Sequence, residues 1–104
     1  MNQCQHLDAI KPVAASNDGC SECLLIGSSW VHLRRCATCG HVGCCDSSPH
    51  RHATRHFRDT AHPLVQSFEP GEDWYWCYVD GVAFNIPDQG PSPSHTIHSI
   101  PRRA

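Results

Sequence analysis

Metal-binding residue types are concentrated in residues 36–62 of this chain. The 104-residue sequence has eight cysteines and nine histidines, and this stretch holds four of those cysteines and five of those histidines. It opens with Cys36-x-x-Cys39, a turn that directs two sulfurs at one ion. Imidazole nitrogens from spaced histidines can complete a tetrahedral Zn²⁺ site. The further donors in the stretch are Cys44, His52, His56 and His62.

Donors of the same types flank this stretch. They are Cys4, His6, Cys20, Cys23 and Cys77. A disulfide framework would need an oxidising compartment. The N-terminus has no basic start followed by an apolar run, so we expect a cytoplasmic protein with reduced thiols and no membrane association. Iron–sulfur clusters prefer thiolate ligands alone, whereas histidine is frequent here, so zinc is the expected metal.

Length and composition indicate one small domain that needs a metal to fold. We expect residues 1–85 to form this domain and residues 86–104, which hold four of the eight prolines, to be a disordered tail. A folded part of about eighty residues buries only a small core and commonly needs metal or disulfide staples. The formal net charge of −2 gives the chain no strong attraction to nucleic acid.

Around the donors, the sequence predicts one helix and several short strands. The helix covers about residues 52–59, and the strands cover residues 30–34, 62–68, 74–79 and 82–84. Trp30 or Val31 is expected to face inward from the first strand. Asp80-Gly81 is typical of a two-residue hairpin turn. Helix and strands together predict an α+β domain with long loops.

These residues follow one another in the order and spacing of a known family. The motifs are Cys4-x-His6, Cys20-x-x-Cys23, Trp30-Val31, Cys36-x-x-Cys39-x₄-Cys44, His52-x₃-His56-x₅-His62-Pro63-Leu64-Val65 and Trp76-Cys77. The chain resembles the UBP-type zinc finger, which ubiquitin-specific proteases carry beside their catalytic parts. It is similar to short bacterial members in which the domain stands alone. The resemblance covers residues 4–84 and implies a twisted antiparallel sheet with one or two helices, held by one to three zinc ions.

The resemblance implies three zinc ions here, and two at the least. One ligand set is Cys4, His6, Cys77 and Asp80, with Asp80 where the family has a cysteine. The second set is Cys20, Cys23, Cys44 and His52. The third set is Cys36, Cys39, His56 and His62.

The residues themselves leave alternatives to this partition. His52 and His56 are four apart on the expected helix and could bind one ion together. Asp80 could be only the turn residue that Asp-Gly sequences favour. His50 is a reserve ligand, and Cys45 is left over.

The resemblance also implies a cleft with aromatic walls. In the family's eukaryotic members this cleft binds the C-terminal Gly-Gly of ubiquitin. Trp30, Trp76 and Tyr78 occupy wall positions and are the expected ligand-binding residues, although such rings could also pack in the core. The family's carboxylate-binding arginine is replaced here by Asp46, which would repel a carboxylate. Arg34, Arg35 or Arg55 would have to supply the cation instead.

The predicted function is a zinc-binding protein-interaction module that takes a peptide or chain terminus in this cleft. We expect no enzyme activity, because twelve ligands for three ions leave no open coordination position. The alternative is a nucleic-acid-binding zinc module that uses Arg51, Arg55 and Arg58 with exposed aromatic rings.

Overall fold

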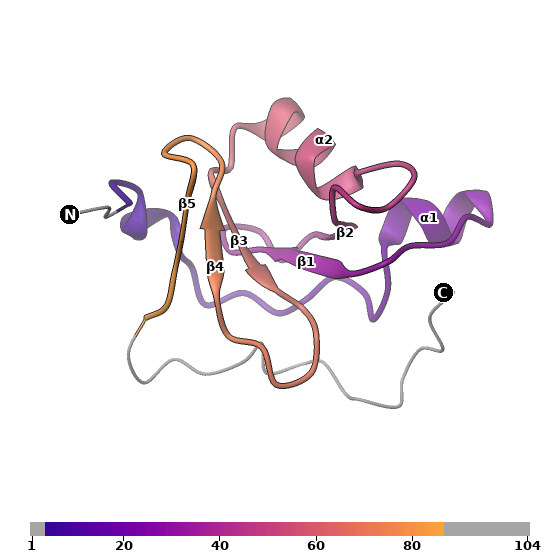
Figure 1. The fold of residues 1–104 in the computed structure, drawn as a ribbon, viewed down its shortest axis with the longest axis horizontal. Helices are drawn as coiled ribbons and strands as arrows, with labels where there is room; N and C mark the ends of the chain where they lie inside the picture. Colours follow the sequence, from indigo (N-terminus) through magenta and orange to yellow (C-terminus); the bar gives the residue numbers. More distant parts are fainter. Residues whose placement is uncertain (1–3, 87–104) are drawn as a thin grey trace.

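One five-stranded antiparallel sheet forms the centre of the structure, a computed structural model that describes residues 4–86 (Figure 1). The strand order is β2-β1-β3-β4-β5. The strands are β1 (Leu33–Cys36), β2 (Val42–Cys44), β3 (Leu64–Ser67), β4 (Tyr75–Cys77) and β5 (Val82–Phe84). The helices are the 3₁₀ turn η1 (Leu7–Ala9), α1 (Ser21–Ile26) and α2 (His52–Thr60). The predicted α+β class is confirmed.

Helix α2 lies over the β1–β2 end of the sheet, and β2 itself was not predicted from the sequence (Figure 1). Gly43 in β2 shows how closely the helix approaches. A Cβ atom on Gly43 would lie 2.7 Å from the backbone nitrogen of Ala53 in α2. The sequence showed Gly43 only as a flexible residue in a metal-binding loop, because the strand is defined by its neighbour β1 and by the helix above it.

Helix α1 is short and was also not predicted. The Cys20 side chain caps it by accepting a hydrogen bond from the backbone N–H of Cys23, and the left-handed Gly27 ends it. The run Leu24–Ile26 lies in this helix and is exposed, with Leu25 86% exposed. Six residues form a stable helix only with tertiary support, and here the two cysteines provide it.

Several predicted strand boundaries differ from the observed ones, since β3 and β4 are also shorter than predicted. The first strand was placed at residues 30–34, but β1 begins at Leu33, where pairing with Cys44 begins. Before that point, Trp30 turns into the core and the backbone N–H of Val31 donates to Ser48 Oγ. The turn between β4 and β5 spans residues 78–81 instead of two residues, with Gly81 at φ 64°.

The apolar core is divided into two small clusters, and cysteines belong to both. The first contains Cys20, Cys23, Trp30, Leu33, Val42, Cys44 and Phe68. The second contains Cys4, Ala37, Leu64, Tyr75 and Cys77. Ile86 packs against the second cluster, although the sequence placed it in the tail. The remainder of that predicted tail, residues 87–104, lies outside the described residues.

The turn after Cys39 should tolerate no side chain at Gly40. Gly40 has φ +85°, and a Cβ atom there would lie 2.0 Å from the carbonyl oxygen of Ala14. Gly71 has a similar φ of +81°, but a Cβ atom there would have no neighbour within 4 Å, so Gly71→Ala should lower the free energy of unfolding by only about 1–2 kcal/mol. Gly40→Ala adds a steric clash and should lower it by about 1–3 kcal/mol more. Thermal unfolding of the zinc-loaded variants measures the difference, and equal losses would contradict the packing described for Gly40.

Candidate metal centres and ligand cleft

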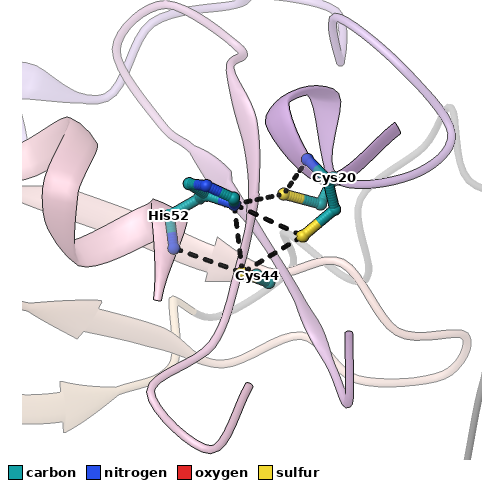
Figure 2. A group of neighbouring side chains, drawn as sticks. Cys20, Cys44 and His52 are labelled. Atoms are coloured by element: carbon teal, nitrogen blue, oxygen red, sulfur yellow. Dashed lines mark hydrogen bonds between the residues drawn. The ribbon is translucent and has the colours of Figure 1, made fainter. Parts of the chain in front are cut away.

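The central cluster consists of Cys20, Cys23, Cys44 and His52, and all four are buried. Nδ1 of His52 lies 3.2 Å from Sγ of Cys20, 3.3 Å from Sγ of Cys23 and 3.5 Å from Sγ of Cys44. Figure 2 shows the side chains of Cys20, Cys44 and His52 converging on one point. The donors come from the N-cap and first turns of α1, the end of β2 and the start of α2.

The helix cluster consists of Cys36, Cys39, His56 and His62. Sγ of Cys36 lies 3.6 Å from Nδ1 of His62, and Sγ of Cys39 lies 3.3 Å from Nε2 of His56. His52 and His56 therefore lie in different clusters although they are one helical turn apart. Nδ1 of His52 faces one set of sulfurs, whereas Nε2 of His56 reaches another.

The terminal cluster consists of Cys4, His6, Cys77 and Asp80. Nδ1 of His6 lies 3.7 Å from Sγ of Cys4, 3.5 Å from Sγ of Cys77 and 3.1 Å from Oδ2 of Asp80. The same carboxylate oxygen accepts a 2.8 Å hydrogen bond from the backbone N–H of Gln5, which lowers the pKa of Asp80. Asp80 is thus held at the cluster in its ionised form and is part of it as well as part of the turn.

The spacing of these atoms fits a tetrahedral zinc site. Zn–S and Zn–N bonds of about 2.3 and 2.0–2.1 Å place neighbouring donors about 3.5–3.8 Å apart. In the central cluster, Sγ of Cys23 lies 3.8 Å from Sγ of Cys44, and the nitrogen–sulfur distances fall at or just below that range. In each cluster all four donor atoms lie within 4.8 Å of one another.

Without a cation, these thiols cannot all ionise. Burial raises the pKa of Cys4 to about 11. A hydrogen bond between Cys20 and Cys44 lowers the pKa of Cys44 to about 5 and raises that of Cys20. One thiolate in the central cluster is therefore stabilised by protonated neighbours. A bound Zn²⁺ replaces those protons and neutralises the buried charge.

Two histidines outside the clusters pack against histidines within them. His41 stacks on His56 with ring centroids 4.3 Å apart, and its Nε2 lies 3.0 Å from Oε1 of Glu22. His50 stacks on His52 at 5.3 Å and is not in the central cluster. The stacking was not predicted from the sequence, since it depends on how α1 and α2 meet the sheet. These contacts position the histidine rings, as outer residues commonly do at metal sites.

A cleft of about 180 Å³ opens beside the aromatic strand β4. Its lining residues are Arg34, Cys45, Asp46, Val65, Trp74, Trp76 and Tyr78. The Tyr78 ring stacks on Phe57 of α2 at 4.8 Å, and burial raises the Tyr78 pKa. Of the three expected ligand-binding residues, Trp76 and Tyr78 lie in this cleft. Cys45, which no ligand set needed, is also part of its wall.

Trp30 lies elsewhere. It is 6% exposed and packs in the first core cluster, and it is not among the residues that line the cleft. Its ring reaches Gly19, where a Cβ atom would lie 2.7 Å from Cη2 of Trp30. The core role that the sequence left open for this ring is the observed one, because Trp30 precedes β1 and packs among the residues of the first core cluster.

Two charged residues of opposite sign border the cleft. The guanidinium carbon of Arg34 lies 4.5 Å from the centroid of the Trp74 ring, and Nη1 of Arg34 donates to the carbonyl oxygen of Leu33. Asp46 accepts a hydrogen bond from the Thr54 hydroxyl. Arg35 is buried and donates to Oε1 of Gln66, so it does not reach the cleft. Of Arg34, Arg35 and Arg55, the three arginines considered from the sequence, only Arg34 lines the cleft.

A small α+β domain whose cysteines and histidines, with one aspartate, gather into three four-donor clusters is a zinc finger by fold and site. Residues 20–89 match the family described as "Zn-finger in ubiquitin-hydrolases and other protein". The chain therefore belongs to the UBP-type zinc finger family, and its three clusters are suited to zinc ions.

The chain is also similar to two other proteins. A solution NMR structure of a protein from Rhodopseudomonas palustris has a TM-score of 0.75 and 55% sequence identity, and the match covers 90% of this chain and 97% of that one. The NAD-dependent deacetylase sir2A of Dictyostelium discoideum is 35% identical over 69 residues, which are 65% of this chain and 12% of the deacetylase. Among residues 4–86 of this chain, no helix has the length and apolar character needed to span a bilayer.

The adjacent cysteines Cys44 and Cys45 provide a test of the clusters. The wild-type protein should carry three zinc ions in native mass spectrometry. Cys44→Ser should lose the ion of the central cluster, because a serine hydroxyl is a much poorer zinc ligand than a thiolate. Cys45→Ser is the matched control and should keep three ions, since Cys45 belongs to none of the three clusters and its Sγ lies 3.6 Å from the Ser48 hydroxyl. Equal zinc loss from both variants would contradict the assignment of Cys44, and not Cys45, to the central cluster.

Proposed function

We propose that this domain is a zinc-stabilised protein-interaction module that binds a peptide segment or chain terminus in the aromatic cleft. The observation that carries the proposal is the grouping of Trp74, Trp76 and Tyr78 around one opening. These three rings are partly exposed. Aromatic rings in a concave site provide a large binding energy at small entropic cost.

The size and charge of the cleft favour part of a peptide over a cofactor. Sites for drug-sized molecules have volumes of about 300–1,000 Å³, whereas this cleft has about 180 Å³. Arg34 and Asp46 border it with opposite charges, so it has no net attraction for a fully anionic or cationic ligand. A side chain or terminal residue, with its neighbouring peptide groups, matches both properties.

The proposed ligand sets also favour binding over catalysis. We assign one zinc ion to each of the three clusters, and each cluster offers four donor atoms. Structural zinc sites take four protein ligands, whereas catalytic sites keep one position for water or substrate. With all positions filled, the ions hold the sheet, helices and N-terminal segment together, and the aromatic cleft binds the partner.

The role of Trp76 can be tested with peptides selected from a random library, without knowledge of the natural ligand. A library of random peptides with free C-termini, passed over the zinc-loaded protein, should yield binders. Trp76→Ala should raise their Kd by at least about tenfold, as expected for a central aromatic contact. Leu25→Ala is the control, because Leu25 is 86% exposed on α1 and outside the cleft. Calorimetry measures the Kd of each variant. A failure to select binders, or equal Kd values for the two variants, would refute the proposed function.

Asp46 should decide the response to a terminal carboxylate. A peptide ending in Gly-Gly should bind the wild type weakly, because its carboxylate meets Asp46 in a partly dehydrated site. Asp46→Arg removes a repulsion and adds an attraction, each about 1–3 kcal/mol, and should tighten binding by about two to four decades.

Two controls separate the charge effect from a change in cleft shape. Asp46→Asn removes only the repulsion and should give an intermediate Kd. The same peptide with an amidated C-terminus should gain nothing from either variant. Tryptophan fluorescence follows the titration, since Trp74 and Trp76 line the cleft. Micromolar wild-type binding of the free carboxylate would contradict this prediction.

A further inference from the structure

A second pocket lies next to the aromatic cleft, and three of its seven lining residues are arginines. It has a volume of about 190 Å³, and its lining residues are Asp46, Pro49, His50, Arg51, Thr54, Arg55 and Arg58. The arginines come from the start and the exposed side of α2, where residues three or four positions apart lie on one face. This pocket takes no part in the three metal clusters.

The arginine pocket is positively charged in a chain whose formal net charge is −2. Three guanidinium groups and one carboxylate leave two positive charges. Within residues 4–86, no side-chain hydrogen bond or ion pair engages Arg51, Arg55 or Arg58. The single carboxylate, Asp46, accepts a hydrogen bond from Thr54. The guanidinium groups are therefore available to an external anion.

Arg51 is the N-cap residue of α2. Arg51 has φ 49° and ψ 51°, a left-handed conformation that glycine or asparagine adopts at lower cost. The conformation itself follows from the metal site, because the next backbone N–H, that of His52, donates to Sγ of Cys44 at 3.2 Å. The metal site requires the turn but does not require arginine, and the guanidinium adds positive charge beside the positive end of the α2 dipole.

We propose that the arginine pocket binds an oxyanion group on the same peptide that occupies the aromatic cleft. The group is the carboxylate of an acidic side chain or a phosphoryl group, since a guanidinium can hold either through two parallel hydrogen bonds. The identity of the partner rests on the proposed function, because the two sites share Asp46 in their walls. Anion binding by the arginines rests only on the pocket itself.

Asp46 favours a peptide over a nucleic acid as this partner. A nucleic acid that stacked a base in the cleft and placed phosphates on the arginines would carry its continuous negative charge past Asp46. A peptide can place a neutral backbone beside Asp46 and one anionic group beyond it. The two positive charges of the pocket match such a single group.

Inorganic phosphate tests the pocket without any peptide. Phosphate should shift the NMR signals of the Nε–Hε groups of Arg51, Arg55 and Arg58 in the zinc-loaded protein at low salt. Arg55→Gln should weaken this binding by about tenfold, the effect of losing one hydrogen bond between charged groups. Lys11→Gln is the control with the same change in charge, because Lys11 is exposed and lies outside the pocket. Trp76→Ala should leave phosphate binding unchanged. Equal effects of Arg55→Gln and Lys11→Gln, or no shifts, would overturn the proposal.

Peptides selected for the cleft then identify the source of the anion. Adding a glutamate or a phosphoserine beside the residue that enters the cleft should tighten binding about tenfold, and Arg55→Gln should abolish that gain. Whether the glutamate peptide or the phosphoserine peptide binds more tightly shows whether the pocket prefers a carboxylate or a phosphoryl group. A single-stranded oligonucleotide that needs both Trp76 and Arg55, with a steep salt dependence, would overturn the peptide proposal. Phosphate binding in a protein that selects no peptides would refute the proposed function while leaving the anion pocket intact.

Discussion

Neutralisation of buried sulfur by a metal cation is the interaction on which the rest of this structure depends. Seven cysteines belong to the three clusters, and six of these seven are buried. Their thiolates would be strongly unfavourable in the interior without a cation. Binding of structural zinc contributes roughly 10–16 kcal/mol per site in finger peptides, which is comparable to the net stability of a whole domain, about 5–15 kcal/mol. The eight cysteines are all free in the structure, so disulfides do not take over this role.

The metal clusters and the apolar core share five cysteines. Cys20, Cys23 and Cys44 pack in the first core cluster, and Cys4 and Cys77 pack in the second. Each metal centre also joins segments that are distant in sequence, since the terminal cluster connects the N-terminal residues to the β4–β5 turn. A domain of this size cannot form a large hydrophobic core. The metal clusters therefore supply stability that a larger core would otherwise provide. They do not occupy the outer side of β4 or the exposed side of α2, where the two candidate binding sites lie.

The two candidate binding sites follow from this arrangement. The central cluster fixes the end of β2 and the start of α2, and Asp46 lies in the short connection between them. Because α2 is held over the sheet, Phe57 can stack on Tyr78, which is one of the residues that line the aromatic cleft. The arginines of α2 then lie on the other side of Asp46. Metal binding thus sets the distance between the aromatic cleft and the arginine pocket. The rings of the cleft lie in residues 74–78, whereas the arginines of the pocket lie in residues 51–58.

The sequence by itself determined the metal chemistry and most of the element types. Cysteine and histidine spacing indicated zinc, and the family resemblance that this spacing carries implied the three sets of four ligands. The structure brings the donor atoms of each set within 4.8 Å of one another. Such spacing is informative because tetrahedral geometry allows few ways to fold a short segment around an ion. The helix His52–Thr60 was predicted to within one residue, and β5 was predicted with the observed bounds.

The tertiary structure alone decided which side chains border the cleft and which are buried. Trp30 packs in the core instead of the cleft, Arg34 reaches the cleft from β1, and β2 and α1 exist only because of their neighbours. Short apolar or aromatic segments carry little local preference, so their burial depends on strand register and on the helix that covers them. Local spacing fixes a metal ligand, whereas the surroundings of an aromatic ring depend on residues far away in the sequence.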